Sequence, residues 1–568
     1  MSLDDSIEKY ALWNASLYGG KASPGAVIGK VIGEFPDAKN DMKAMAAKVN
    51  ARIKEVNRLS LEEQKGLIAK KFPELLEERK KERSDELKEL EGVDLKKGVV
   101  MRFAPSPSGP MHLGHAITGG LTSLYVKKYG GKFILRIEDT NSDNIDPFAY
   151  DQLPRDGEWI FGNVSEVWVQ SDRLKVYYDY MERFLDKEAV YVCTCSQEAF
   201  KECSTKKEDC PCRGLSKSEQ IVRWKNMFDK KSGFKEGEAV VRFKSGMQDK
   251  NPAMRDFPLM RINDSEHPRQ GRKFRVWPLM NFSVAVDDIE AGMTHIIRAK
   301  DHADNAKRQE KMYKALGLSF APKTYFLGRY NFEGLELSCS KTKARIEAGE
   351  FSGWDDIRLP FLVALRRRGY QPESLLKYSR LVGLSLTDKS VAAEEFFKAI
   401  DSYDKEVLDP ISKRFFIIRN PVKIAVDGAP AQVVELDLHP DNEKGGRKLK
   451  TASEFFVDEQ DYKVLKKEGL YRLMDCLNLR SEKGKFTFDS LEYEKYKEKG
   501  AKIIHWLPAE EKLLKVEVLM PDNKAVECLG EPMLERLKVG DVIQAERFGF
   551  MRLDSKNKDK LVFWFAHN

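Results

Sequence analysis

Apolar positions change their spacing several times along the chain, and these changes predict where helices and strands lie. Up to about residue 97, apolar residues recur at helical spacing between blocks of charge, as in LEEQKGLIAKKF. This pattern predicts a helical extension. From Gly98 the chain becomes a short apolar strand (GVVMRFAP), a loop, an apolar-faced helix (MHLGHAITGGLTSLYVKKYG) and a second strand (KFILRIEDTN). Strand, loop, helix and strand in this order are typical of a parallel α/β sheet.

The remainder of the chain is organised differently. Residues 190–275 are irregular, helix and strand then alternate again, and residues from about 345 to 400 have a helical pattern. Beyond residue 401, short β-rich runs separated by Gly, Pro, Asn and Asp turns are typical of barrels. The predicted segments are 1–97 (helical extension), 98–190 and 276–343 (two halves of an α/β core), 191–275 (an insertion in the core), 344–400 (helical connector) and 401–568 (β-barrel region).

Charge and hydropathy narrow the class of protein. The 568 residues carry 97 Lys plus Arg and 90 Asp plus Glu, a net charge of +7, which excludes an extreme polycation and permits a nucleic-acid partner. No apolar run reaches the ~18 residues that a membrane-spanning helix needs. The first residues, MSLDDSIEKY, lack the apolar core of a signal peptide. We therefore expect a cytoplasmic protein with no membrane partner.

Two histidines stand where the first predicted strand meets its helix. In the motif HLGH, His112 and His115 flank Gly114 at the helix N-terminus, where backbone N–H groups favour a phosphate. The arrangement predicts binding of a nucleoside triphosphate and stabilisation of charge on its phosphate. Because a lone HxGH motif is only moderately specific, an incidental pair of histidines remains the alternative.

The cysteines are clustered. Five of the eight lie between Cys193 and Cys212, in two Cys-x-Cys pairs separated by 14 residues. Two short-spaced pairs of this kind predict a closed, tetrahedral and structural Zn²⁺ site formed by Cys193, Cys195, Cys210 and Cys212. Cys203 is an alternative ligand, and reduced free thiols or disulfides are the alternative states.

Several blocks carry a resemblance to one family. RFAPSPSGPMHLGHA resembles the signature of class I aminoacyl-tRNA synthetases of the glutamyl/glutaminyl subgroup, with Ser108 at a threonine position. ILRIEDTN, GRYN and WDDIRLPFLVALRRRGYQPESL are similar to further blocks of that subgroup, and the β-rich tail to its glutaminyl and archaeal/eukaryotic glutamyl branch. The resemblance covers about 98–568. It implies a Rossmann-type catalytic core, an insertion that binds the acceptor end of tRNA, and a barrel region that binds the anticodon.

The resemblance also implies the chemistry: ATP, bound with Mg²⁺, activates an amino acid that is then transferred to tRNA. The implied catalytic residues are His112, His115, Lys341 and Lys343. The implied ATP-binding residues are Pro105, Gly109, His112, Gly114, His115, Arg329, Tyr330, Ser338 and Lys341. In the second signature, LSCSKTK, Cys339 stands at a signature lysine, so we assign the cation to Lys341, with Lys343 as second choice.

The amino-acid pocket distinguishes glutamate from glutamine. The residues that the resemblance implies there are Arg102, Ala104, Ser106, Glu138, Met280 and Arg298. Glu138 would bind the substrate ammonium group, and Arg298 would bind the side-chain carboxylate of glutamate, whereas glutaminyl enzymes have a small uncharged residue at that place. An unpaired guanidinium is costly in a pocket for a neutral amide, so Arg298 favours glutamate. Many family members have Tyr at the position of Met280.

We expect L-glutamate and tRNA(Glu) as partners, with tRNA(Gln) left open as a further substrate. The alternatives are a glutaminyl enzyme, a truncated paralogue that glutamylates a tRNA base, and a non-catalytic tRNA-binding protein. The long tail argues against the truncated paralogue.

The tail holds 30 Lys plus Arg and 31 Asp plus Glu, so RNA contact there depends on local patches. Its candidates for anticodon contact are Arg414, Phe415, Arg419 and Arg447.

Overall fold

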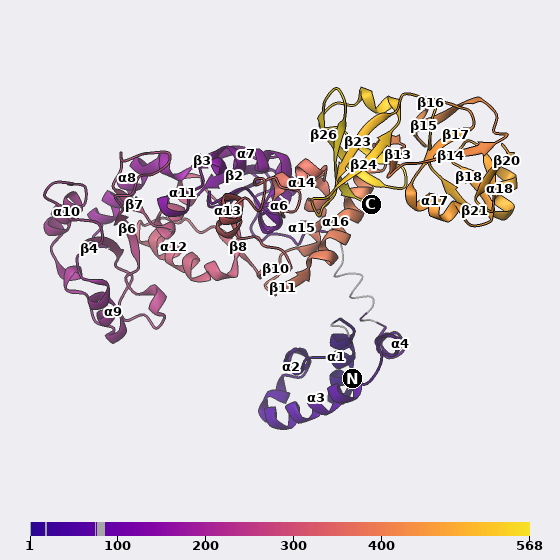
Figure 1. The fold of residues 1–568 in the computed structure, drawn as a ribbon. Coiled ribbons are helices and arrows are strands. Elements are labelled where there is room, and N and C mark those ends of the chain that lie inside the picture. Colours follow the sequence, from indigo (N-terminus) through magenta and orange to yellow (C-terminus); the bar gives the residue numbers. More distant parts are fainter. Residues whose placement is uncertain (1, 18–19, 74, 76–85) are drawn as a thin grey trace. The chain divides into compact units, whose positions relative to one another are not determined.

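The computed structural model describes residues 2–17, 20–73, 75 and 86–568 (Figure 1). The chain divides into two compact units, residues 1–86 and 87–568. Each has its own apolar core, so the two units are described separately below.

The first unit is helical. Its helices are α1 (Leu3–Leu17), α2 (Pro24–Glu34), α3 (Met42–Val56) and α4 (Leu61–Lys71). The Ser60 side chain accepts the Glu63 N–H and Glu63 accepts the Ser60 N–H, so a capping box begins α4. The helix ends two residues before Pro73, which disfavours helical backbone in the residue preceding it.

The helical pattern predicted up to residue 97 is only partly correct. Residues 86–97 are irregular, with positive φ at Gly92 and an isolated bridge between Asp94 and Gly98. Glycine favours the turn there, while Leu87 and Leu90 pack into the core of the second unit. Apolar spacing alone did not reveal this, because two leucines three residues apart suit either a helix or a folded loop. Residues 76–85 lie outside the described part of the chain.

The α/β core is built on parallel strands, as the sequence predicts. β1 (Val99–Phe103), β2 (Gly131–Ile137) and β3 (Glu166–Val169) form one parallel sheet. β8 (His295–Ala299) pairs in parallel with β9 (Lys323–Leu327), and the Thr294 and Val100 backbones are hydrogen-bonded, which places β8 next to β1. Helix α6 (Leu113–Tyr129) connects β1 to β2. The N-terminus of α6 therefore lies at the carboxyl edge of β1, where ligands of such sheets bind.

The insertion between the two halves of the core has its own sheet. Strands β4 (Val190–Cys193), β5 (Val240–Phe243), β6 (Pro258–Ile262) and β7 (Val276–Pro278) are antiparallel and follow chain order. Helices α8 (Leu174–Asp186), α9 (Gln197–Lys206) and α10 (Lys217–Asn226) accompany them. The chain returns to the core through α11 (Met280–Glu290), and α12 (Ala303–Ala315) connects β8 to β9.

The connector is helical apart from one short strand. It contains α13 (Cys339–Glu347), α14 (Leu362–Arg368), α15 (Pro372–Val382) and α16 (Ala393–Leu408). The strand is β11 (Lys389–Ala392), which pairs in parallel with β10 (Tyr330–Glu333).

The tail is rich in sheet, as predicted (Figure 1). The hairpin β15 (Gln432–His439) and β16 (Glu443–Thr451) accompanies two seven-stranded sheets, each with a separate apolar core. One sheet has the order β12 (Arg414–Phe415), β25 (Val542–Ala545), β26 (Gly549–Lys556), β27 (Leu561–His567), β23 (Leu514–Leu519), β24 (Ala525–Gly530), β13 (Ile417–Arg419). The other has the order β21 (Gly500–Ile504), β18 (Gly469–Leu473), β19 (Asn478–Glu482), β20 (Lys485–Ser490), β14 (Val422–Asp427), β17 (Glu454–Val457), β22 (Trp506–Pro508).

Candidate active site

The two histidines of HLGH are held by the backbone at the start of α6. His112 is the N-cap residue, and its Nδ1 accepts the Gly114 N–H at 3.1 Å. The Nδ1 atom of His115 accepts the His112 N–H at 3.3 Å, and the two rings stack with centroids 3.7 Å apart. Because both Nδ1 atoms accept hydrogen bonds, a neutral ring carries its proton on Nε2. The motif thus offers two Nε2–H donors.

These donors are uncharged at neutral pH. Burial lowers the pKa of His112 to about 4. Burial, together with the neighbouring His112, holds the pKa of His115 well below its usual value. The histidines therefore stabilise phosphate charge as preorganised neutral donors, and lysine or arginine must supply any full positive charge.

The low pKa of His112 predicts a loss of stability in acid. The unfolded histidine binds a proton below about pH 6.5 while the folded one does not, so stability falls as the pH drops from there towards 4. At about pH 5 this single group accounts for roughly 2 kcal/mol of lost unfolding free energy. His112→Asn keeps an N-cap acceptor without titrating, so urea unfolding near neutral pH and near pH 5 should show a smaller acid loss for this variant. Equal losses for the variant and the parent protein would contradict the prediction.

A cavity of about 240 Å³ opens beside these histidines. It is lined by the start of α6 and by the segments that carry β9, β10 and β11. Gly328 packs closely there: a Cβ atom on it would lie 2.2 Å from the carbonyl oxygen of Thr387. The cavity collects five of the residues predicted to bind ATP, namely His112, Gly114, His115, Arg329 and Tyr330. Arg329 also forms an ion pair with Asp301 at 2.8 Å.

A second cavity, of about 530 Å³, lies under the LSCSKTK segment. Ser106, Ser108 and Ser338 line it with Lys343, whose Nζ lies 3.4 Å from Asp146 Oδ2. Lys341 does not line this cavity; its Nζ lies 3.3 Å from Glu336 Oε2 and its side chain is 71% exposed. The cavity is therefore lined by Lys343, the second choice from the sequence, and not by Lys341, the first choice.

Cys339 occupies a tight position in this second cavity. A Cβ atom on Gly109 would lie 3.1 Å from the Cys339 sulfur and 3.0 Å from the Trp354 ring. Burial raises the pKa of the Cys339 thiol. Cys339 brings no positive charge to the cavity, so the cation must come from elsewhere in the segment. Pro105, also predicted to bind ATP, is buried, and its carbonyl accepts the Glu138 N–H.

Charged side chains from β1, β2 and α11 contact one another near the carboxyl end of β1. Arg136 donates to Asp288 (Nη1 to Oδ1, 2.7 Å) and to Glu138 (Nη2 to Oε1, 3.1 Å), and Arg102 Nε lies 3.6 Å from the same Asp288 oxygen. Arg102, Arg136 and Asp288 are buried. Asp288 Oδ2 and Arg102 Nε are buried without a hydrogen-bond partner in the described structure. The group is an incomplete charge network.

Arg298, near the end of β8, is 7% exposed. The charges of this network act on its guanidinium. Burial, and then the neighbouring charge of Arg102, lower the pKa of Arg298 to about 10. Its Nη1 donates to Gln309 Oε1 at 2.9 Å, its Nε has no partner, and no carboxylate within the described residues forms an ion pair with it. A buried guanidinium in this state favours an incoming carboxylate.

The remaining residues predicted for the glutamate pocket differ in burial. Ser106 is exposed and lines the second cavity, Ala104 is half-buried, and Met280 is the half-buried first residue of α11. Their roles stay predictions.

Sequence reasoning missed Arg136, Asp287 and Asp288. Asp287 accepts hydrogen bonds from Gln170, Arg173 and Tyr177 and is fully buried. The signal was present: two acidic residues inside the apolar run FSVAVDDIE must be paired, because charged side chains are rarely buried alone.

The clustered cysteines come together in space. The Cys195 and Cys210 sulfurs are 3.3 Å apart, the Cys193 and Cys210 sulfurs 3.5 Å, the Cys195 and Cys212 sulfurs 3.8 Å, and all four lie within 4.8 Å of one another. Thiolates at about 2.3 Å from a tetrahedral zinc ion are about 3.8 Å apart, so the spacing fits the metal. The Thr194 N–H donates to Cys212 Sγ at 3.5 Å. Cys203 is not part of the group.

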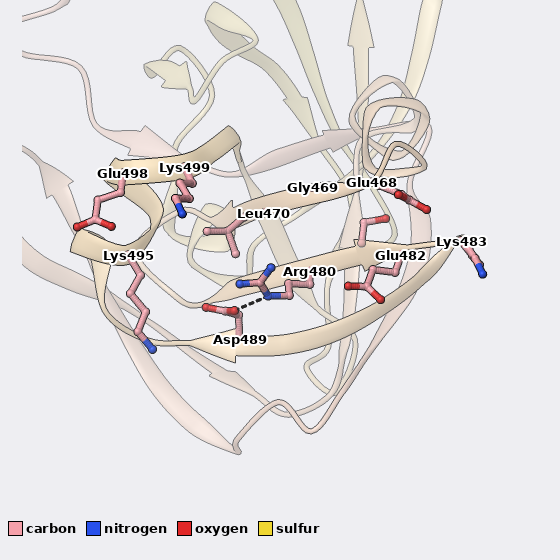
Figure 2. A pocket seen from close by; sticks show the side chains of 11 residues that line it. Glu468, Gly469, Leu470, Arg480, Glu482, Lys483, Asp489, Lys495, Glu498 and Lys499 are labelled. Carbon is pink, nitrogen blue, oxygen red and sulfur yellow. Dashed lines mark hydrogen bonds and ion pairs between the residues drawn. The ribbon is translucent and has the colours of Figure 1, made fainter.

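A charged pocket of about 520 Å³ lies in the tail, on β18, β19, β20 and α18 (Tyr493–Lys499) (Figure 2). Its cations are balanced by as many carboxylates, and Arg480 pairs with Asp489 at 2.7 Å. The pocket therefore offers no positive patch.

Two tail residues predicted to contact the anticodon are unsuited to that role. Phe415 is buried in the core, and Arg447 is buried beside Glu531. Arg414 and Arg419 form ion pairs with Asp409 and Asp458.

Comparison with known families gives consistent matches over most of the chain. Residues 98–410 match the model for the catalytic domain of class I (E and Q) tRNA synthetases. Residues 412–494 and 503–554 match two models for the anti-codon binding domain of the same group.

Curated relatives match over their whole length. A protein of Methanobrevibacter smithii is 41% identical over 100% of this chain and 99% of its own. Proteins of Methanothermobacter thermautotrophicus (42% identical; 100% and 99% covered) and Thermococcus kodakarensis (40% identical; 99% and 99% covered) are similarly close. All three are named glutamate–tRNA ligase.

No helix in the described part of the chain is long and apolar enough to cross a membrane.

Proposed function

The chain belongs to the class I tRNA synthetases of the E and Q group, and we propose that it joins L-glutamate to the 3′ end of tRNA(Glu) at the expense of ATP. The observation that favours glutamate over glutamine as the substrate is the state of Arg298. Its guanidinium is buried and forms no ion pair with a carboxylate among the described residues. A neutral amide would leave that charge uncompensated, whereas the side-chain carboxylate of glutamate completes it.

In the first step, a carboxylate oxygen of glutamate attacks the α-phosphate of ATP, and pyrophosphate leaves. A phosphorus–oxygen bond forms to glutamate and the bond to the β-phosphate bridge breaks. The Nε2–H groups of His112 and His115 donate to the phosphate, with the charge of Lys343 or Lys341 added from the LSCSKTK segment. ATP enters as its Mg²⁺ complex. Positioning and electrostatics supply the catalysis, because no proton must be removed from the attacking carboxylate.

In the second step, the terminal ribose hydroxyl of tRNA attacks the carbonyl carbon of the glutamyl adenylate, and AMP leaves. The antiparallel insertion is proposed to hold the acceptor end, and the two seven-stranded sheets of the tail the anticodon. Charging of tRNA(Gln) with glutamate would be a second reaction, and it would depend on contacts to the anticodon.

Pyrophosphate exchange tests this function. With tRNA present, purified protein should exchange labelled pyrophosphate into ATP when glutamate is added, and exchange with glutamine should be weaker by roughly 10²-fold or more. Equal exchange with both amino acids would contradict the role of Arg298, and no exchange with either would support a non-catalytic tRNA-binding protein.

The four clustered cysteines are proposed to hold one structural Zn²⁺ ion. All four positions of a tetrahedron are occupied by sulfur, so the metal would order the insertion without contacting substrate. Zinc thiolates of this kind are usual in a reducing compartment, so we propose a cytoplasmic location together with this site.

Removing one thiolate should release the metal. Elemental analysis of purified protein should find about one zinc per chain, and Cys210→Ser should retain little of it and unfold the insertion at lower temperature. Cys203→Ser, which changes a cysteine outside the cluster, is the matched control and should keep its zinc. Zinc well below one equivalent in the unaltered protein would contradict the proposal.

A further inference from the structure

Gln309 is the one side chain that holds Arg298 by a hydrogen bond in the described structure. It lies on α12, two turns into the helix that follows β8, and is 2% exposed. Its Oε1 accepts from Arg298 Nη1 at 2.9 Å. The bond fixes one nitrogen of the guanidinium and leaves the positive charge in place.

Two buried donors at this contact lack acceptors. Gln309 Nε2 and Arg298 Nε have no hydrogen-bond partner in the described structure, and both are closed off from solvent. A buried N–H group without an acceptor is unfavourable, so a ligand that brings acceptor oxygens is bound more tightly. A carboxylate brings two such oxygens and a negative charge, whereas an amide brings one oxygen and two further donors.

The neutrality of Gln309 is as important as its hydrogen bond. Elsewhere in the same network, Arg136 forms ion pairs with Asp288 and Glu138, and these two carboxylates neutralise its positive charge. A carboxylate in place of the Gln309 amide would likewise neutralise the charge of Arg298. An amide orients the guanidinium without neutralising it.

We propose that Gln309 is a specificity-determining positioning residue: it holds Arg298 for the side-chain carboxylate of the substrate and leaves the guanidinium charge free for it. This inference rests on the proposed function, because it assumes that glutamate is the substrate that Arg298 meets.

Gln309→Glu tests the charge. The new carboxylate pairs with Arg298, so the KM of glutamate in pyrophosphate exchange should rise by about 10²-fold or more, and the preference for glutamate over glutamine should fall by at least as much. The KM of ATP should stay within about threefold, because the ATP cavity does not include Gln309. Lys307→Gln changes the net charge of α12 by the same amount from an exposed position and is the matched control.

Gln309→Met tests the hydrogen bond and keeps the proposal falsifiable if the charged variant does not fold. Methionine keeps the volume and removes the acceptor. A hydrogen bond to a charged group contributes roughly ten- to a hundredfold in binding, so the KM of glutamate should rise by about that factor with kcat and the KM of ATP little changed. A purely structural residue would instead change all three together, or lower the melting temperature without changing the KM of glutamate. Either result would overturn the proposal.

The unaltered protein is measured first, with glutamate and with glutamine. If it exchanges pyrophosphate with neither, the proposed function fails and Gln309 is irrelevant. If it exchanges with glutamate and both Gln309 variants keep its KM for glutamate within about threefold, the function stands and the positioning role is wrong.

Discussion

Arg298→Gln should raise the KM of glutamate in pyrophosphate exchange by about 10²- to 10⁴-fold, because removing one partner of a buried ion pair costs about 3–5 kcal/mol. Arg298 is 7% exposed, and without substrate no carboxylate among the described residues forms an ion pair with it. A glutamine at this position can still accept or donate a hydrogen bond, but it carries no charge to attract the substrate. Activity with glutamine should rise relative to glutamate.

Arg380→Gln, on the exposed side of α15, is the matched control and should leave both KM values unchanged. The KM of ATP separates a loss of glutamate binding from damage to the fold, because the ATP cavity is formed by other residues. If Arg298→Gln keeps the KM of glutamate of the unaltered protein, the specificity argument is wrong.

The second large effect is expected from the lysines of the LSCSKTK segment. Lys341→Met combined with Lys343→Met should lower kcat of pyrophosphate exchange by about 10²- to 10³-fold or more, the usual cost of removing a preorganised charge at a phosphate. Cys339 cannot supply that charge, since burial raises the pKa of its thiol and a thiol carries no positive charge. The KM of glutamate should change little, because neither lysine contacts the Arg298 network.

The single variants rank the two lysines. Lys343 lines the cavity next to Ser108 and pairs with Asp146, whereas Lys341 pairs with Glu336 at the surface. We therefore expect Lys343→Met to cause the larger loss, in contrast to the order that motif position suggested. Lys314→Met on α12 is the control for loss of an exposed lysine. Exchange near the level of the unaltered protein in the double variant would remove both lysines from the mechanism.

Much of the fold could be predicted from pattern alone. The β1–α6–β2 unit follows from apolar strands that alternate with an apolar-faced helix, and the sheet-rich tail from short runs between turn residues. The irregular segment 86–97 could not, because two leucines at helical spacing also suit a loop that packs on the core. Local spacing does not say which surface an apolar residue will meet.

The site was predictable where a motif fixes the backbone, and less so where charges from distant segments meet. His112 and His115 are three residues apart on one helix end, so their proximity follows from the sequence. Arg136, Asp288 and Gln309 lie on three different elements, and only the assembled sheet brings them to Arg102 and Arg298. The choice between Lys341 and Lys343 depended on side-chain direction, which a motif does not encode.

Charging of tRNA with competing amino acids tests the central claim most directly. Purified protein, ATP with Mg²⁺ and tRNA(Glu) are incubated with labelled glutamate in the presence of excess glutamine, and acid-precipitable label on the tRNA is counted. The buried, uncompensated charge of Arg298 predicts that label accumulates on tRNA(Glu) and that excess glutamine does not reduce it. Attachment of labelled glutamine in the reciprocal experiment, at a rate equal to that of glutamate, would contradict the account.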